Sequence, residues 1–194
     1  LPQPKEGYQW YSIRFRSIRD ETGRAIKLIG QLTNIHHQKL EEDRLRHEAS
    51  TDLLTQIYNK ITTEHLVSLE SQEGRSHALI VVDLDKFKYA NDTFGHLFGD
   101  SVIKAVAAPL RATFRATDIV GRTGGDEFVV LAKDISLSDG LETLKAKCRR
   151  LSVELAHVSL GQDYVISASI GISLFPRDGK TYAELFAKAD AALY

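Results

Sequence analysis

The sequence contains a single cysteine, Cys148, which excludes an internal disulfide bond. This cysteine falls on an apolar stripe of helical spacing together with Leu141, Leu144, Leu151 and Leu155. Free cysteine behaves as a small apolar residue when it is buried. We therefore interpret Cys148 as part of the core, with a reactive thiol as the alternative.

A strong net charge is also absent, because 25 basic and 26 acidic residues give a formal charge of -1. Without a broad basic field, long DNA or RNA is not expected as a ligand, and a nucleotide site must depend on a few placed groups. The hydrophobic fraction of 43% is sufficient for a buried core.

No apolar run approaches the roughly 20 residues that cross a bilayer, and no signal peptide is recognisable. We expect a cytoplasmic segment, with any membrane attachment through upstream segments outside this sequence. The chain starts without methionine and stops at Tyr194 inside an expected helix that has no cap. These ends are typical of a fragment of a longer protein.

The first 50 residues predict a β-hairpin followed by a helix. Strand-like patterns over residues 8–18 and 26–33 flank the turn residues 20–23. Residues 34–50 are charged and lack glycine and proline, with only a weak heptad seam. They predict a helical linker, and a solvated helix is the alternative.

After residue 51, helical and strand patterns alternate. Helices are expected over residues 60–69, 100–114, 140–155 and 181–194, and strands over residues 78–82, 119–122, 127–131 and 165–174. Gly124 and Gly125 predict a tight hairpin turn with positive φ. This order favours an α+β fold with a central, mostly antiparallel sheet flanked by helices.

Three carboxylates stand at positions where they can share a site. Asp83 and Asp85 follow a buried strand, and Asp126 follows the glycine turn. A strand end and a hairpin tip can be neighbours in one sheet, and Mg²⁺ prefers carboxylate oxygens that it shares with substrate phosphates. The spacing suits phosphoryl transfer, whereas local turn capping is the alternative.

Four ordered stretches of the sequence resemble the signatures of the GGDEF family. They are Asp52, Leu54-Thr55 and Asn59; then Asp83-Leu84-Asp85-Lys86-Phe87-Lys88 with Asn91-Asp92, Gly95-His96 and Gly99-Asp100; then Gly121-Arg122 with Gly124-Gly125-Asp126-Glu127-Phe128; and finally Ser169-Ile170-Gly171-Ile172, Pro176, Asp178-Gly179 and 189–194. The resemblance covers residues 52–194. It implies a nucleotidyl cyclase (palm-like) fold and diguanylate cyclase activity, which condenses two GTP molecules into cyclic di-GMP and two pyrophosphates.

The resemblance also implies a cation site and a catalytic set. Asp83, Asp126 and the Leu84 carbonyl would hold Mg²⁺ or Mn²⁺, which would acidify the attacking 3′-hydroxyl. Asp83, Asp126 and Glu127 form the catalytic set that we expect. Glu127 has a salt-bridged structural role as its alternative.

Contacts to the nucleotide follow from the same resemblance. The Lys86 and Phe87 amides and the Lys88 ammonium would meet phosphate oxygens, and the turn Gly124-Gly125 would lie against the nucleotide. An ordinary surface lysine is the alternative for Lys88.

Guanine selection is assigned to Asp100, with Asn91 as its partner on the base. One carboxylate can accept both the N1-H and N2-H donors of guanine, whereas N1 of adenine would repel it. The alternative is that Asp100 caps a helix that begins near Ser101. His96 is interpreted as structural.

Arg115-Ala116-Thr117-Asp118 resembles the product-inhibition motif of the family. Arg115 would fork onto guanine O6 and N7 of cyclic di-GMP, with Asp118 beside it. A surface Arg–Asp ion pair is the alternative.

The product requires two linkages, so two protomers would have to face each other as a homodimer. Residues 1–35 resemble the C-terminal part of a PAS sensor domain, residues 36–50 the helical linker, and residues 51–194 a GGDEF domain truncated at its C-terminal end. The sensor would then bias the pairing of two cyclase domains through the linker.

Two departures from the family pattern concern one turn, because Gln56 replaces the usual glycine and Lys60 the usual arginine. The stop at Tyr194 removes basic residues that in the family appear to hold the γ-phosphate. The alternative function is a non-catalytic GGDEF module that binds GTP or cyclic di-GMP and regulates a partner domain. A dimerising signalling scaffold is a third interpretation.

Overall fold

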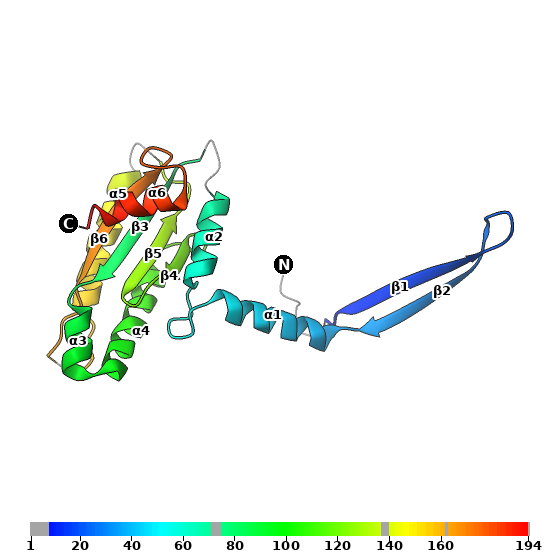
Figure 1. The fold of residues 1–194 in the computed structure, drawn as a ribbon, viewed down its shortest axis with the longest axis horizontal. Coiled ribbons are helices and arrows are strands. Elements are labelled where there is room, and N and C mark those ends of the chain that lie inside the picture. Colours follow the sequence, from blue (N-terminus) through cyan, green and yellow to red (C-terminus); the bar gives the residue numbers. More distant parts are fainter. Residues whose placement is uncertain (1–7, 71–74, 137–139, 162, 194) are drawn as a thin grey trace. The chain divides into compact units, whose positions relative to one another are not determined.

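The structure is a computed structural model that describes residues 8–70, 75–136, 140–161 and 163–193, without the side chains of residues 46 and 47. The chain divides into two compact units, Leu1–Ala49 and Ser50–Tyr194. Each unit is a separate arrangement of helices and strands (Figure 1).

The first unit contains a hairpin and a helix. Strands β1 (Tyr11–Arg19) and β2 (Ala25–Asn34) pair antiparallel, which confirms the expected hairpin. Asp20 organises the turn, because its carboxylate accepts hydrogen bonds from the backbone amides of Thr22 and Arg24. No described residue of 8–49 is buried.

Helix α1 (His36–Ser50) is stabilised by ion pairs along its own surface. Arg44 pairs with Glu41 and Glu48, and Lys39 pairs with Glu42. Pairs three or four residues apart contribute about 0.2–0.5 kcal/mol each to an isolated helix. The charged sequence of this segment thus supports the predicted helix directly.

The second unit contains both helices and strands. Its elements are α2 (Lys60–Glu70), β3 (His77–Leu84), α3 (Phe87–Phe94), α4 (His96–Thr113), β4 (Ile119–Arg122), β5 (Glu127–Ala132), α5 (Gly140–Ala156), β6 (Ala168–Phe175) and α6 (Tyr182–Asp190).

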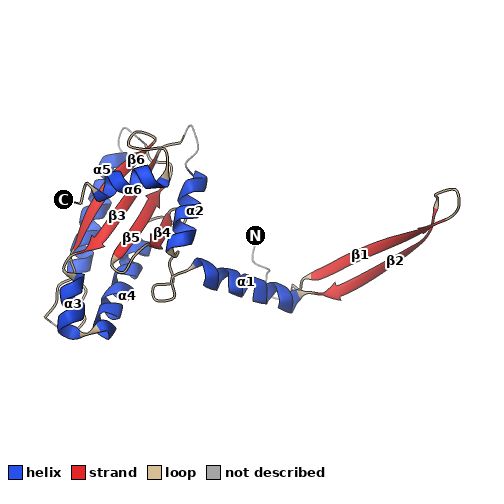
Figure 2. Ribbon diagram, in the orientation of Figure 1, coloured by secondary structure: helices blue, strands red, loops and turns tan. Residues whose placement is uncertain are grey.

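The four strands of this unit form one antiparallel sheet in the order β4-β5-β3-β6. Strand β3 lies between β5 and β6 and is hydrogen-bonded to both, so its C-terminal end has a neighbouring strand on each side. Figure 2 shows the sheet between layers of helices. The predicted α+β fold with an antiparallel sheet is confirmed.

The side chains of β3 alternate between two cores. Ile80 and Val82 face one core, which α4 and α5 cover, and Leu79 and Val81 face the other, which α2 and α6 cover. This alternation is the period of two that a pleated strand imposes. Cys148 belongs to the α4 and α5 core, and burial raises the pKa of its thiol to about 11, as expected for an unreactive core cysteine.

Several elements differ from the sequence prediction. Helix α3 was not expected, helix α4 begins at His96 instead of residue 100, and α6 ends at Asp190, before the expected end at residue 194, which lies outside the described residues. Strand β6 begins at Ala168 instead of residue 165. Helix α6 starts with a capping box between Thr181 and Glu184, which fixes its first turn.

None of the helices in the described part of the chain combines the length and apolar character needed to span a bilayer.

Candidate functional site

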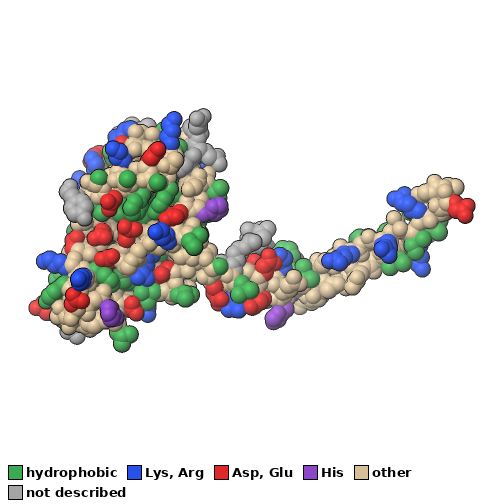
Figure 3. Space-filling model, in the orientation of Figure 1, with side chains coloured by type: hydrophobic (Ala, Val, Ile, Leu, Met, Phe, Trp, Pro, Cys, Tyr) green, Lys and Arg blue, Asp and Glu red, His purple; other side chains and the backbone are tan. Residues whose placement is uncertain are grey.

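The acidic residues of two strands meet at one end of the sheet. In the register of β3 and β5, Asp83 lies opposite Glu127, and the Leu84 amide donates a hydrogen bond to the Asp126 carbonyl at 3.2 Å. The predicted neighbourhood of Asp83 and Asp126 therefore follows from the pairing of the strands. Acidic side chains gather on this face of the unit in Figure 3.

The carboxylate of Asp83 experiences an unfavourable electrostatic environment. Burial, and then the neighbouring charges of Asp126, Glu127, Asp85 and Asp190, raise the pKa of Asp83 above its ordinary value. Carboxylates whose pKa is raised in this way are common at functional sites, because binding of a cation or a proton offsets the cost of the buried negative charge.

A cavity of about 600 Å³ opens beside Asp83 and Asp85. Asp83, Leu84, Asp85 and Lys86 line it from the end of β3, and Ser167, Ser169 and Leu193 line it from the neighbouring segments. Among the described residues, no three His, Cys, Asp or Glu side chains are arranged to hold a metal ion.

The donor set nevertheless fits a hard divalent cation. Two carboxylates with a backbone carbonyl leave positions for water and phosphate oxygens, as Mg²⁺ usually requires. Burial, and then repulsion by neighbouring carboxylates, raise the pKa of Asp83, and a bound cation would offset both effects.

Glu127 is held by the turn that precedes it. The Thr123 hydroxyl donates a hydrogen bond to Glu127 Oε1, and the Thr123 amide donates one to the Glu127 carbonyl at 3.0 Å. Within the described ranges Glu127 forms no ion pair, so the salt-bridged alternative is not found. No pattern in the sequence indicates this role of Thr123.

The glycine turn differs from the expectation in its backbone. Among the described glycines, positive φ values occur at Gly23, Gly95 and Gly161 but at neither Gly124 nor Gly125. At position 124 an added Cβ would lie 3.3 Å from the Glu127 Cβ, which is a tight contact. The prediction of positive φ at this turn was therefore wrong.

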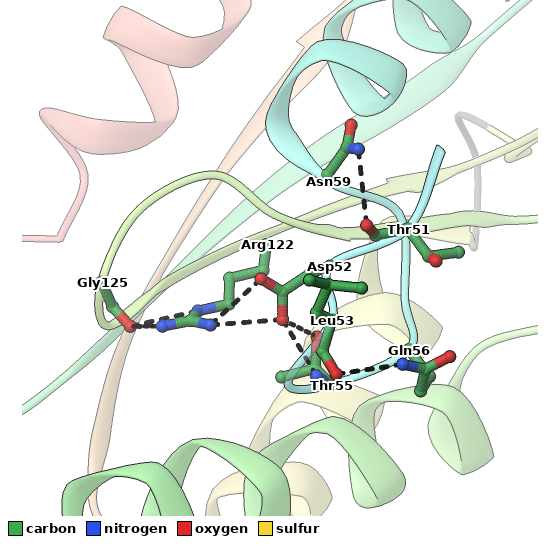
Figure 4. A network of polar contacts seen from close by, with 8 residues as sticks. All are labelled: Thr51, Asp52, Leu53, Thr55, Gln56, Asn59, Arg122 and Gly125. Atoms are coloured by element: carbon green, nitrogen blue, oxygen red, sulfur yellow. Dashed lines mark hydrogen bonds and ion pairs between the residues drawn. The ribbon is translucent and has the colours of Figure 1, made fainter. Parts of the chain in front are cut away.

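Arg122 fixes the glycine turn from outside (Figure 4). Its Nη2 and Nε donate to the Gly125 carbonyl at 2.8 and 3.2 Å, and its Nη1 donates to both oxygens of Asp52 at 3.2 Å. Asp52 also accepts bonds from the amide and hydroxyl of Thr55. The family resemblance included both Asp52 and Arg122, but their pairing was not predicted.

Gln56 continues this turn with a backbone φ of 59°, a value that residues other than glycine rarely adopt. Its amide donates to the Asp52 carbonyl at 2.8 Å, and its side chain reaches the Leu53 carbonyl at 3.0 Å. The turn is therefore kept despite the absence of the usual glycine.

The residues expected to meet phosphates lie where β3 gives way to α3. Lys86 precedes α3 with φ of 57°, Phe87 is the first helical residue, and Lys88 is exposed. The first amides of a helix have no partner within the helix and favour anions.

The two residues expected to recognise guanine come from neighbouring helices. The Asn91 side chain of α3 lies against Gly99 of α4, where an added Cβ would clash with Asn91 Oδ1. Asp100 follows Gly99 and is exposed. Because α4 begins at His96, Asp100 lies beyond the first turn, and the alternative of a helix cap at Asp100 is wrong.

Arg115 and Asp118 line a second cavity of about 250 Å³, together with Lys133 and Lys147. Asp118 accepts hydrogen bonds from the backbone amides of Arg115 and Lys133 at 2.8 and 3.0 Å. No ion pair between the Arg115 and Asp118 side chains occurs in the described structure, so the surface-pair alternative is not found. The Arg115 side chain is exposed beside the cavity.

Comparison with known proteins identifies one family for most of the chain. The family described as "Diguanylate cyclase, GGDEF domain" matches residues 49–194. The GGDEF domain of DgcB from Caulobacter crescentus, solved in complex with c-di-GMP, is 27% identical with a TM-score of 0.65, covering 75% of this chain and 88% of that one.

Two curated relatives from Escherichia coli K12 carry different activities in their names. Diguanylate cyclase DosC is 30% identical over 92% of this chain and 41% of its own length. Cyclic di-GMP phosphodiesterase PdeR is 30% identical over 97% of this chain and 29% of its own length. The chain thus spans less than half of either relative.

Proposed function

Residues 49–194 place this chain in the GGDEF family of diguanylate cyclases, and on that basis we propose that it condenses two GTP molecules into cyclic di-GMP and two pyrophosphates. The observation that carries the proposal is the pairing of β3 with β5. This pairing sets Asp83 and Leu84, which line one cavity, next to Asp126 on the neighbouring turn.

A divalent cation is the cofactor that we propose for this site. Bound Mg²⁺ or Mn²⁺ would acidify the 3′-hydroxyl of GTP and neutralise charge on the α-phosphate. Asp83 and Asp126 supply carboxylate oxygens, and Leu84 supplies its carbonyl. Glu127, fixed by Thr123, keeps a third negative charge at the same end of the sheet.

The chain's own groups position the nucleotide. Lys86 and Phe87 direct amides toward the phosphates, Lys88 adds a cation, and the Gly124-Gly125 turn leaves room for close approach. Asp100 accepts the two adjacent donors of guanine and Asn91 binds the same base. An exposed carboxylate next to Gly99, with Asn91 packed on that glycine, supports this pairing.

Catalysis in this proposal requires a homodimer. One site holds one GTP, and each 3′-hydroxyl must reach the α-phosphate of the other nucleotide, so two protomers face each other. GTP is an intracellular nucleotide, which places the proposed reaction in the cytoplasm.

Residues 1–35 are proposed to be the C-terminal part of a PAS domain, and residues 36–50 the linker to the catalytic domain of residues 51–194. The hairpin exposes large apolar side chains, including Ile13, Phe15, Leu28 and Leu32, which are 57–66% exposed. An exposed apolar surface of this kind is typical of an element that packs against further structure.

Product inhibition is proposed for the cavity beside Arg115. The guanidinium would bind guanine O6 and N7 of cyclic di-GMP, while Asp118 holds the turn through two backbone amides. Lys133 and Lys147 add positive charge to the cavity lining.

The proposed activity is tested by incubating the chain, and separately its full-length parent protein, with GTP and Mg²⁺ and separating the products by chromatography. We expect cyclic di-GMP, and we expect its loss in Asp126→Ala. The matched control is Glu142→Ala, which removes an exposed carboxylate from α5, outside the cavity lining.

The alternative is a GGDEF module that binds GTP or cyclic di-GMP without turnover, and the phosphodiesterase named among the relatives favours testing it. Tight nucleotide binding without product in the parent protein would support that module and overturn the cyclase proposal.

A further inference from the structure

Asp85 is an acidic residue of the site to which the proposed reaction assigns no role. It lies two residues after Asp83 at the same strand end and lines the same cavity. Two carboxylates so placed can both bind a cation, or one can bind the cation while the other fixes the local backbone. The hydrogen bonds of Asp83 and Asp85 differ.

The side chain of Asp85 is bound by strand β6. The Ser169 hydroxyl donates a hydrogen bond to Asp85 Oδ1 at 2.8 Å. By contrast, the carboxylate of Asp83 accepts no hydrogen bond within the described residues, although Ser169 lies opposite Asp83 in the register of β3 and β6. The Ser169 hydroxyl is therefore hydrogen-bonded to Asp85, whereas the carboxylate of Asp83 remains available to a cation.

The backbone of Asp85 is held by the segment that leads into β6. Its amide donates to the Ser167 carbonyl at 3.0 Å, and its carbonyl accepts from the Tyr164 hydroxyl at 3.4 Å. The side chain and both backbone groups of Asp85 are thus attached to residues 164–169.

The next residue has a backbone that requires such support. Lys86 adopts φ of 57° and ψ of 25°, a left-handed conformation that is costly for a residue with a side chain. Helix α3 starts directly after it, and no side chain caps that start. The Lys86 carbonyl accepts the bond from the Ala90 amide at 3.1 Å, so the direction of α3 depends on this left-handed residue.

We infer that Asp85, bound by Ser169, is a positioning residue that fixes the left-handed turn at Lys86 and thereby aims the first amides of α3 at the nucleotide phosphates. This inference rests on the proposed function, because it assumes that a guanine nucleotide occupies the cavity. It assigns cation binding to Asp83 and positioning to Asp85.

Binding of 3′-deoxy-GTP with Mg²⁺ to the full chain tests this inference, because that nucleotide lacks the attacking hydroxyl and cannot be condensed. The dissociation constant is measured by titration calorimetry. Bound Mn²⁺ in the presence of the same nucleotide is counted by electron paramagnetic resonance. The variants are Ser169→Ala, Ser169→Thr and Asp85→Asn.

The matched control is Ser173→Ala on the same strand. Its hydroxyl donates to the Leu185 carbonyl in the core, so the variant also loses a β6 serine hydrogen bond but lies away from the cavity. A general weakening of β6 would affect both serine variants equally.

Loss of a hydrogen bond to a charged group is expected to raise the dissociation constant of Ser169→Ala roughly tenfold, without changing the number of bound Mn²⁺ ions. Ser169→Thr keeps a hydroxyl and restores binding. Asp85→Asn keeps an acceptor for Ser169, so its dissociation constant changes by less than about threefold on the same reasoning. Ser173→Ala leaves nucleotide binding unchanged.

Two results would overturn the inference. Loss of bound Mn²⁺ in Asp85→Asn would make Asp85 a cation ligand, and unchanged nucleotide binding in Ser169→Ala would show that the pair positions nothing. Wild-type protein that binds 3′-deoxy-GTP but makes no cyclic di-GMP from GTP would contradict the cyclase proposal alone. Wild-type protein that does not bind 3′-deoxy-GTP would contradict both.

Discussion

Arg122 Nη1 lies 3.2 Å from both carboxylate oxygens of Asp52, although 70 residues separate the two positions. The same guanidinium holds the Gly125 carbonyl, next to Asp126. The turn after α1 and the turn that carries a proposed cation ligand are therefore joined by one side chain. The two side chains are only 16% and 23% exposed, so solvent screens this pair less than a surface pair.

Arg122→Ala is expected to lower both stability and activity. The variant leaves the Asp52 carboxylate and the Gly125 carbonyl without their shared donor, which costs about 1–3 kcal/mol of unfolding free energy. Urea unfolding measures that loss, and cyclic di-GMP formation measures the effect on the turn. Arg150→Ala, which breaks the exposed pair with Glu154, is the control. Equal effects of the two variants would contradict a special role for Arg122.

Gln56→Gly is expected to stabilise the protein. Gln56 has φ of 59°, and relief of this left-handed conformation should outweigh the lost bond to Leu53 by roughly 0.5–1 kcal/mol. The urea midpoint should rise with an unchanged slope. Gln56→Ala removes the same side-chain bond without relieving the backbone, so a gain in that variant too would show that strain is not the cause.

Asp83→Asn is expected to raise stability while abolishing cyclic di-GMP formation. The folded-state pKa of Asp83 is raised above its unfolded value of 3.8, so the carboxyl stabilises the fold while protonated, at low pH. That contribution is lost as pH rises through the folded-state pKa. At neutral pH without divalent cations, the variant should therefore unfold roughly 2–4 °C higher than the wild type.

Below about pH 3 this difference should vanish, because both side chains are then uncharged. Mg²⁺ with GTP should raise the unfolding temperature of the wild type but not that of Asp83→Asn. Thermal unfolding across pH, with and without Mg²⁺, checks both statements. A variant less stable than the wild type at neutral pH would contradict the repulsion described here.

Gly99→Ala is expected to weaken GTP binding by displacing Asn91, whose Oδ1 lies where the new methyl group would be. Asp100→Asn, in contrast, should reduce the preference for GTP over ATP, because an amide can donate to N1 of adenine. Competition of ATP against labelled GTP distinguishes the two effects. Ala108→Gly in the same helix is the control for altered helix stability. Undiminished guanine preference in Asp100→Asn would remove Asp100 from base recognition.

Arg115→Ala is expected to increase product yield by relieving inhibition. The measurement is the cyclic di-GMP concentration that halves the initial rate, which should rise at least about tenfold if a bidentate contact to guanine is lost. Arg111→Ala removes another exposed arginine from the end of α4 and serves as the control. Unchanged sensitivity to added cyclic di-GMP in Arg115→Ala would contradict the proposed inhibitory site.

The elements with strong periodic patterns were predictable from the sequence. Strand β3 shows a continuous apolar run because its two faces contact different cores, and the stripe containing Cys148 marks the buried side of α5. The approach of Asp83 to Asp126 was also predictable, because it requires only that a strand end and a hairpin tip be neighbours.

Other features depend on contacts between distant residues. Helix α3 has eight residues and one buried side chain, Ala90, and it starts from a left-handed residue without a side-chain cap, so neither periodicity nor capping marks it. The start of α4 was missed for a related reason, because its first turn has no capping side chain. The bonds of Arg122 to Asp52 and of Ser169 to Asp85 join segments 70 and 84 positions apart.

The place of β3 between two bonded strands has a dynamic consequence. Residues 78–82 are fully buried, so their amides should exchange with solvent only when the whole sheet opens, whereas the short helix α3 can open by itself. Asp83 and Leu84 thus continue directly from the most protected residues of β3, whereas Asn91 stands on a helix that can open by itself. We therefore expect nucleotide binding to order helix α3 while strand β3 remains unchanged.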